Sequence, residues 1–239
     1  MNEADRARRP QTHRFEDDDL GLRLTVGRSE ILFTKASSGT FAGPDADAIT
    51  AVERLSGIEF ACWAQDEQVH GSEVRVIADG DDVAAFSRPC DAQVTARDDV
   101  LCAVRTADCL PVLLAGDDAV GAVHAGWRGL AEGVLAAAVA AISELGEAQP
   151  TAVIGPGARG CCYEVGDDLL ATFADYPAAT HGLRNLDLAV IATAQLTELG
   201  VANIYDCGTC TICSRPEQFF SFRRDSGNTG RMLGAIWLN

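Results

Sequence analysis

The sequence feature that most constrains the fold is a succession of short apolar segments separated by clusters of Gly, Asp and Pro. These segments predict strands at residues 31–34, 60–64, 74–77, 100–105, 111–115, 120–124, 153–154, 219–224 and 232–238. Helical spacing of apolar residues predicts helices at 45–55, from about 127 to 145, and at 186–199. Strands outnumber helices without a regular βαβ alternation. We therefore expect an α+β fold, a single domain with mixed β-sheets flanked by helices.

The chain has 239 residues, enough for one large domain, and the segment before Leu20 is charged and lacks apolar periodicity. We expect a mobile tail over residues 1–19 and one domain carrying the functional site over residues 20–239. With 19 Lys and Arg against 35 Asp and Glu, the formal net charge is −16. Such a charge repels phosphate backbones and anionic lipid headgroups, so it argues against nucleic-acid and membrane partners.

The cellular compartment follows from the N-terminus and the apolar runs. The chain opens without the apolar stretch of a signal peptide, and its longest apolar run, residues 134–142, is too short to cross a bilayer. These features predict a cytoplasmic protein. In a reducing compartment, Cys residues serve packing or chemistry rather than disulfide bonds.

The chain holds nine Cys and four His, so the role of each Cys matters. The run Cys207-x-x-Cys210-x-x-Cys213 is compatible with a metal site or a redox pair. No fourth ligand is evident from the sequence, so no function is assigned to this run. Cys161 and Cys162 are expected to be small buried packing residues.

Three potential metal ligands, His70, Cys109 and His124, lie where predicted strands give way to loops. Their separations of 39 and 15 residues match no zinc-finger spacing, so only the fold could bring them together. Two imidazoles and one thiolate suit Zn²⁺, and three protein ligands leave a fourth position open, as in catalytic zinc sites. The alternative is a buried Cys beside two hydrogen-bonded His residues.

The sequence around these residues resembles the signature stretches of one protein family. The matching stretches include QVHG at 68–71, ADCLPV at 107–112 and VHAGWRG at 123–129, with others at 155–156, 162–166, 210–211, 219–225 and 229–232. The family is named variously multicopper polyphenol oxidase, laccase-domain protein, purine nucleoside phosphorylase and peptidoglycan editing factor. The resemblance implies zinc ligands at His70, Cys109 and His124, and with them Cys109 and His124 as catalytic residues.

The resemblance also implies a function. It predicts a zinc enzyme with phosphate and a purine nucleoside as substrates: phosphorolysis of adenosine, inosine, guanosine and methylthioadenosine, and deamination of adenosine. The implied fold is similar to that of cysteine hydrolases of the cytotoxic necrotising factor type. Where the family usually has an Arg in its first loop, this chain has Lys35, which is expected to take over the substrate contact.

The remaining candidates supply charge near the ligands. Arg128, at the start of a predicted helix, would contact substrate or phosphate, or form a structural salt bridge. Arg223 and Arg224 alternate along a predicted strand, so one should face the site and the other solvent, and the sequence does not decide which. Asp108 adjoins Cys109 and is the candidate carboxylate for acid–base catalysis or for orienting a ligand His.

Three other functions stay open at this point. A copper polyphenol oxidase is one, although four His cannot furnish a full multicopper cluster; Cu²⁺ could still occupy the zinc ligands. A metal-free hydrolase is another, with Cys109 as nucleophile and His124 as its base. Peptidoglycan editing is the third, and no residue of the sequence points to it.

Overall fold

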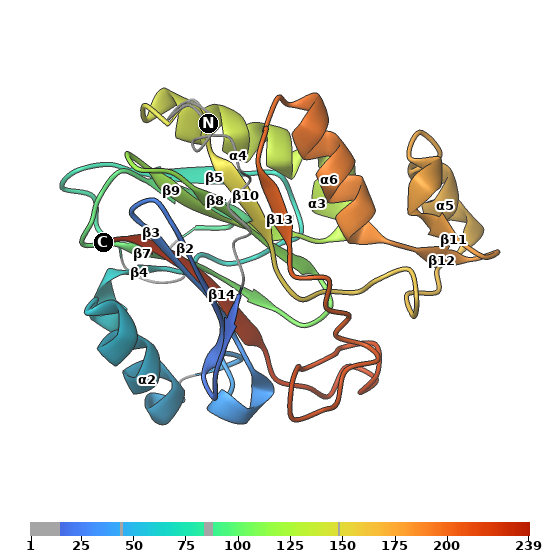
Figure 1. The fold of residues 1–239 in the computed structure, drawn as a ribbon, viewed down its shortest axis with the longest axis horizontal. Coiled ribbons are helices and arrows are strands. Elements are labelled where there is room, and N and C mark those ends of the chain that lie inside the picture. The colour runs from blue at the N-terminus through green and yellow to red at the C-terminus, as the bar shows by residue number, and fades with distance from the viewer. Residues whose placement is uncertain (1–14, 44, 84–87, 148) are drawn as a thin grey trace, which may run out of the picture.

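The computed structural model describes all residues except 1–14, 44, 84–87 and 148. Within this part of the chain, two six-stranded sheets pack face to face (Figure 1). The first sheet runs, in spatial order, through β1 (Glu16–Asp17), β2 (Gly21–Val26), β3 (Ser29–Thr34), β14 (Met232–Leu238), β7 (Leu101–Thr106) and β4 (Trp63–Ala64). The second runs through β13 (Ile204–Asp206), β10 (Thr151–Ile154), β8 (Leu110–Ala115), β9 (Val120–Ala125), β6 (Ala92–Thr95) and β5 (Val74–Ile77).

Both sheets are mixed, because each combines antiparallel and parallel pairs. The parallel pairs are β4 with β7, β5 with β6, and β10 with β13. The helices and the remaining short elements are α2 (Ala46–Ser56), α3 (Trp127–Glu132), α4 (Val134–Glu144), α5 (Asp167–Thr172), α6 (Leu188–Glu198), the 3-10 turns η1 (Ala36–Ser38), η2 (Phe60–Cys62) and η3 (Pro177–Ala179), and the hairpin β11 (Thr180–His181) with β12 (Asn185–Leu186). The predicted single-domain α+β fold with mixed sheets is confirmed.

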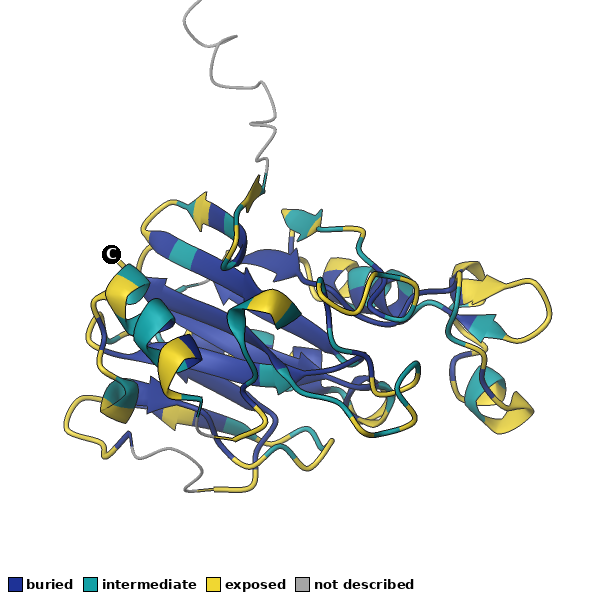
Figure 2. Ribbon diagram, turned by 90° about the horizontal axis from the view of Figure 1, so that it is seen from below, coloured by how far each residue is buried: buried dark blue, intermediate teal, exposed yellow. Residues whose placement is uncertain are grey.

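The central strands bury both of their faces, which is why they read as continuous apolar runs. On β14, Ile236 and Leu238 point into the layer between the two sheets, whereas Ala235 and Trp237 point to the opposite face. Successive side chains of a strand alternate between faces, so one strand serves two apolar layers. Figure 2 shows these strands as the buried centre of the molecule.

Helices cover the outer face of each sheet. Val52 of α2 packs in the same apolar cluster as Trp63 and Trp237 of the first sheet. On the other side, Leu135 of α4 and Leu196 of α6 pack in the cluster that covers the second sheet. The order of layers is therefore helix, sheet, sheet, helix, as the positions of α2 and α4 in Figure 1 show. Among the described residues, no helix has the length and apolar character needed to cross a membrane.

Three sequence predictions fail locally. The segment predicted as a strand at 60–64 is the 3-10 turn η2 followed by the two-residue strand β4. The helix predicted from about 127 to 145 is two helices, because Gly133 adopts a left-handed conformation with φ of 86° and ends α3. The strand predicted at 219–224 is absent from the described structure, and residues 222–227 form turns instead. There the N–H of Gly227 donates to the carbonyl of Phe222, so the backbone bonds locally rather than to a neighbouring strand.

The structure describes residues 15–19 of the predicted tail over residues 1–19. These residues include β1, which pairs with β2, and Asp18, whose carboxylate accepts hydrogen bonds from the N–H groups of Leu20 and Gly21. Residues 1–14 lie outside the described structure. The described domain thus begins before Leu20.

The layer between the sheets should contribute strongly to stability. Leu113 on β8 is fully buried there, so Leu113→Ala is expected to lower the free energy of unfolding by about 2–5 kcal/mol. Leu183→Ala is the matched control, because that side chain is 93% exposed. Urea denaturation of both variants tests the difference. Equal midpoints for the two variants would contradict the expected contribution of the inter-sheet layer.

Candidate metal centre

The fold brings His70, Cys109 and His124 together. Their ligand atoms all lie within 4.8 Å of one another, and the two imidazole rings meet edge to face with centroids 4.8 Å apart. His124 is buried, Cys109 half-buried and His70 exposed. The three side chains therefore form one group that opens to solvent on the His70 side.

The sheet packing explains how residues so distant in sequence meet. Cys109 lies in the short connection from β7 to β8, which carries the chain from the first sheet to the second. His124 lies near the end of the neighbouring strand β9, paired opposite Pro111 of β8. His70 and Asp108 have φ of 65° and 87°, two of the three non-glycine residues with positive φ in the described chain. Such backbone strain gathers at functional sites, where the surrounding structure holds it in place.

Asp91 orients the site, although the sequence analysis did not identify it. Its buried carboxylate lies 2.7 Å from Nδ1 of His124 and accepts hydrogen bonds from the N–H groups of Val69, His70 and Gly71 at 3.1, 2.9 and 2.7 Å. Burial raises the pKa of Asp91, but the hydrogen bonds from His124 and Gly71 outweigh it and lower the pKa overall. Since a carboxylate only accepts, Nδ1 of His124 donates to Asp91, and Nε2 is the nitrogen that could bind a metal, with release of its proton.

Cys109 and His124 favour the charged forms of each other. Burial raises the pKa of the Cys109 thiol, but the charge and hydrogen bond of His124 lower it to about 6. Burial lowers the pKa of His124, while the Cys109 thiolate and the Asp91 hydrogen bond raise it to about 9. The thiolate is the form of Cys that binds metals and acts as a nucleophile, so the site presents Cys109 in its reactive state.

A cavity of about 650 Å³ lies beside these residues, within the range of about 300–1,000 Å³ usual for small-molecule sites. Its wall combines the three candidate ligands with aromatic and cationic side chains: Ala42, Gln68, His70, Arg105, Ala107, Asp108, Cys109, His124, Trp127, Tyr163, Phe222, Arg223, Gly227, Thr229 and Arg231. An acidic protein has thus gathered several guanidinium groups at one cavity.

Arg223 and Arg224 take different directions, although both lie in a turn and not on the predicted strand. Arg223 lines the cavity, with its guanidinium 5.0 Å from the ring centroid of Tyr163 and a 2.6 Å hydrogen bond to the carbonyl of Glu164. Arg224 turns away, but into the protein rather than to solvent. It donates to carbonyl oxygens within the loop 211–219 and to Asp225.

The structure does not place Arg128 and Lys35 among the described residues that line the cavity. Arg128 is exposed, and its guanidinium lies 5.0 Å from the ring centroid of Trp127. Lys35 pairs with Asp17 and donates to the carbonyl of Asp18, so it serves the N-terminal segment. The predicted substrate contacts of both residues are not supported by this geometry.

Asp108 lines the cavity, but its carboxylate is occupied. It accepts hydrogen bonds from Oγ1 of Thr211, Oγ of Ser221 and the N–H of Arg223, at 2.6, 3.1 and 2.7 Å. Asp91, and not Asp108, orients the candidate ligand His124. The structure makes Asp108 the anchor of the loop that carries Arg223.

Arg105 and Arg231 are cavity residues that the sequence analysis missed. Arg105 lies on β7 and Arg231 directly precedes β14, and these two strands pair. Burial and the positive charge of Arg231 lower the pKa of Arg105. The sequence did hold a signal for Arg105, which is a lone Arg in the apolar run 101–106. A charge in a buried strand needs a structural or functional reason.

Comparison with known proteins identifies the family. Residues 25–239 match the sequence profile of the family described as multi-copper polyphenol oxidoreductase laccase. The chain belongs to this family. The resemblance found in the signature stretches is thereby confirmed.

Relatives of this chain carry a different name from that of the family. A protein named purine nucleoside phosphorylase from Streptomyces coelicolor is 37% identical over 231 residues, covering 89% of this chain and 92% of the relative. One of the same name from Aquifex aeolicus is 44% identical over 146 residues, covering 61% of this chain and 69% of the relative.

Solved structures show the same fold. The hypothetical protein YfiH from Bacillus licheniformis superposes with a TM-score of 0.82 at 27% identity, covering 94% of this chain and 99% of that one. Protein NMB0706 from Neisseria meningitidis has a TM-score of 0.76 at 30% identity, covering 96% and 100%.

The family description implies a metal, and the donor set at the site fits one. Two imidazoles and a thiolate converge, one imidazole is oriented by a carboxylate, and the thiolate form of Cys109 is favoured. This mixture of nitrogen and sulfur donors suits Zn²⁺ and copper alike.

Removing the negative charge of Asp91 should weaken metal binding. Asp91→Asn keeps the shape but replaces an oxygen that accepts hydrogen bonds, so we expect metal affinity to fall about 10- to 100-fold. Competition against a chromophoric chelator measures it with Zn²⁺. Asp175→Asn, at an exposed position, is the control and should leave affinity unchanged. Equal affinity in both variants would contradict the orienting role of Asp91.

Gly126 allows the ligands to approach closely. A Cβ added there would lie 3.1 Å from Sγ of Cys109 and 3.2 Å from Cδ2 of His70, closer than ordinary contact. Gly126→Ala should therefore displace both side chains by tenths of an ångström and lower metal affinity by about an order of magnitude. Gly43→Ala is the control, since a Cβ there meets nothing within 4 Å. An Ala at 126 with unaltered Zn²⁺ affinity would disprove the steric argument.

Proposed function

We propose that this chain is a purine nucleoside phosphorylase with zinc held by His70, Cys109 and His124. Its substrates would be phosphate and adenosine, inosine, guanosine or methylthioadenosine. The observation that supports this most is one cavity that joins a two-imidazole, one-thiolate group to several arginines. The names of the relatives from Streptomyces coelicolor and Aquifex aeolicus support it independently.

Arg105 and Arg231 are the proposed phosphate site. Each lines the cavity, and the charge of Arg231 disfavours the charged form of Arg105. An anion between two guanidinium groups offsets that repulsion, and guanidinium matches phosphate oxygens in a bidentate geometry. In a protein with a net charge of −16, a dianion binds only where cations outweigh the overall field.

The nucleoside would occupy the aromatic side of the cavity. Phe222 is 52% exposed, an unusual position for a large apolar side chain, and it lines the cavity together with Tyr163. An exposed ring at a cavity offers a face on which a purine can stack. Arg223 lies against Tyr163, and Asp108 holds the backbone of Arg223 in place, so this wall is set before substrate arrives.

The remaining residues orient the reacting groups. Phosphorolysis needs phosphate and the ribose C1′ held close together, so positioning supplies much of the rate. Asp91 fixes the ring of His124, and Asp108 would act as a positioning residue rather than an acid, because three donors occupy its oxygens. Zinc bound by the three ligands would supply a Lewis acid that polarises an oxygen of a bound substrate.

Release of hypoxanthine from inosine and phosphate tests the proposal. Zinc-loaded wild-type protein should form hypoxanthine, and Cys109→Ala should not. Arg231→Gln should raise KM for phosphate about 10- to 100-fold, because a charge-assisted hydrogen bond contributes about 1.5–3 kcal/mol. Arg184→Gln, an exposed Arg paired with Asp167, is the matched control and should leave KM unchanged. Loaded protein that releases no base from inosine, adenosine, guanosine or methylthioadenosine would refute phosphorolysis.

Further measurements distinguish phosphorolysis from the alternative activities. Inosine formed from adenosine without phosphate identifies deamination at the same cavity. Copper content after expression without added copper, together with oxidation of a phenol, identifies a polyphenol oxidase. The chain has four His in all, too few for a multicopper cluster within one chain, which favours zinc at the three ligands.

A metal-free hydrolase is the second candidate, and one observation favours it. Cys109, His124 and Asp91 line up as nucleophile, base and orienting carboxylate, with His124 bonded to Asp91 at 2.7 Å. His70 has no part in such a triad but is needed for zinc. If His70→Ala keeps its activity and the protein binds no zinc, the hydrolase replaces the phosphorylase.

A further inference from the structure

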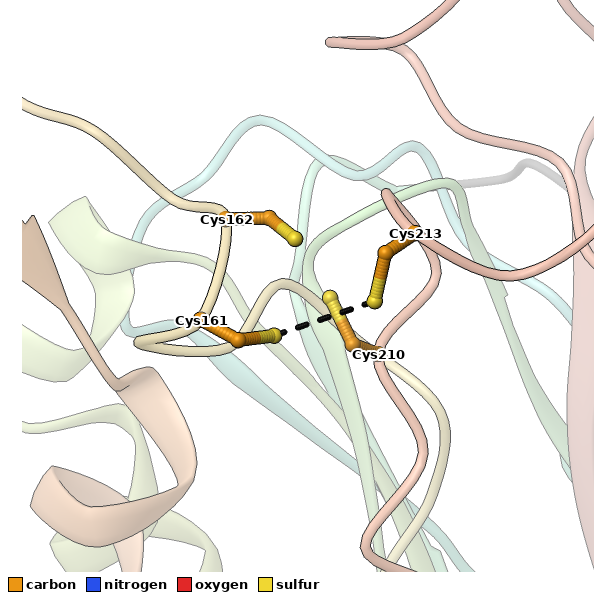
Figure 3. A group of neighbouring side chains, drawn as sticks. All are labelled: Cys161, Cys162, Cys210 and Cys213. Carbon is orange, nitrogen blue, oxygen red and sulfur yellow. Dashed lines mark hydrogen bonds between the residues drawn. The ribbon is translucent and has the colours of Figure 1, made fainter.

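A second group of sulfurs lies outside the cavity described above. The Sγ atoms of Cys161, Cys162, Cys210 and Cys213 all lie within 4.8 Å of one another, and Figure 3 shows them pointing toward a common centre. The first two come from the segment after β10 and the other two from the segment after β13. The sequence alone showed no fourth ligand for the run of Cys207, Cys210 and Cys213. The fold brings two more Cys residues, Cys161 and Cys162, beside Cys210 and Cys213.

Burial corrects the prediction for the first pair. Cys161 and Cys162 were expected to pack as buried residues, but Cys161 is exposed and Cys162 half-buried, and Cys213 is exposed as well. Packing therefore does not account for these thiols. Cys207, three residues before Cys210, belongs elsewhere, since it packs against the core between the sheets.

We propose that Cys161, Cys162, Cys210 and Cys213 form a structural zinc site, the four-cysteine cluster. Zinc binds four thiolates in a tetrahedron with Zn–S distances of about 2.3 Å, which places the sulfurs about 3.8 Å apart. Sγ of Cys161 and Sγ of Cys213 lie 3.8 Å apart. The spacing Cys210-x-x-Cys213 is the one that zinc ribbons and related sites use for one half of their ligands.

The segments carrying the sulfurs are held firmly, as a metal site requires. Cys210 forms an isolated β-bridge with Gly157, and both the N–H and the hydroxyl of Ser214 donate to the carbonyl of Cys210. The guanidinium of Arg224 donates to the carbonyls of Thr211 and Ser214, on either side of Cys213. The loop is thus fixed without help from a bound ion.

Backbone donors surround one of the sulfurs. The N–H groups of Cys213, Arg159 and Ile212 lie within hydrogen-bond reach of the sulfur of Cys210. Four thiolates around Zn²⁺ carry a net charge of −2, and backbone N–H donors of this kind offset part of it. On binding, the thiols release their protons to solvent and each sulfur forms one bond to zinc.

A disulfide does not describe this arrangement. All nine Cys lie within the described residues and all are unbridged. The 3.8 Å between the sulfurs of Cys161 and Cys213 is nearly twice the about 2.05 Å of an S–S bond. Four sulfurs that converge on a centre suit a metal better than pairwise bonds.

The proposed ion would join two loops that are connected to the cavity, one by a lining residue and the other by a hydrogen bond to one. Cys162 precedes Tyr163, which lines the cavity, and Cys210 precedes Thr211, which bonds the carboxylate of Asp108. Zinc here would cross-link the segments 157–163 and 206–215 without contacting substrate. This inference does not depend on the proposed activity.

Zinc stoichiometry tests the four-cysteine cluster separately from the other site. Cys109→Ala removes one ligand of the cavity site, and this variant, purified under reducing conditions and loaded with Zn²⁺, should retain one zinc per chain through gel filtration. Adding Cys161→Ser and Cys213→Ser should remove that zinc. Cobalt in place of zinc should give Cys109→Ala the charge-transfer absorption of tetrahedral cobalt thiolate, and the triple variant should lose it.

The control is Cys207→Ser in the Cys109→Ala background, which removes a neighbouring Cys outside the cluster and should keep the zinc. If the triple variant does not fold, Cys109→Ala with Cys213→Ser alone should still lose zinc to a chelator more readily than its parent. The proposal is overturned if folded Cys109→Ala protein binds no zinc. It is equally overturned if peptide mapping of the wild type finds a disulfide within the cluster while reducing conditions are maintained.

Discussion

The packing of two sheets through one apolar layer is the constraint on which the rest of the structure depends. Phe33 and Ile236 from the first sheet meet Leu113 and Val153 from the second in that layer. Because the sheets face each other, the chain can pass from one to the other within the residues 107–109. That crossing places Cys109 at the edge of both sheets, where strands end and side chains can face an open cavity.

Two buried or nearly buried carboxylates organise this edge. Asp91 holds the ring of His124 and the backbone around His70, and Asp108 holds the loop that carries Arg223. Each carboxylate accepts hydrogen bonds from chain segments that are distant in sequence. Buried carboxylates that are fully hydrogen-bonded specify one arrangement of their partners, which is what a site assembled from loops needs. The arginines of the cavity then supply the positive field that the acidic protein lacks elsewhere.

Much of the fold could be predicted, and the reason is visible in particular strands. Residues 232–238 were predicted as a strand and form β14, since an apolar run buried on both faces has few other solutions. The run 219–224 was also predicted as a strand, but the backbone there bonds locally and residues 222–227 form turns. The candidate ligands His70, Cys109 and His124 were identified from residue chemistry and family resemblance. Asp91 was not, because nothing near it in the sequence shows which imidazole it would reach.

The sequence by itself determined the class of fold, the family, the three residues that meet at the cavity and the acidic charge that argues against nucleic-acid partners. These depend on local patterns and on side-chain chemistry, which can be read directly from the sequence. Only the tertiary structure decided that Arg105 and Arg231 share a cavity, that Arg223 enters it while Arg224 does not, and that Cys161 and Cys162 complete a cluster with Cys210. The physical reason is that these are contacts between distant segments, and strand pairing and sheet packing set them.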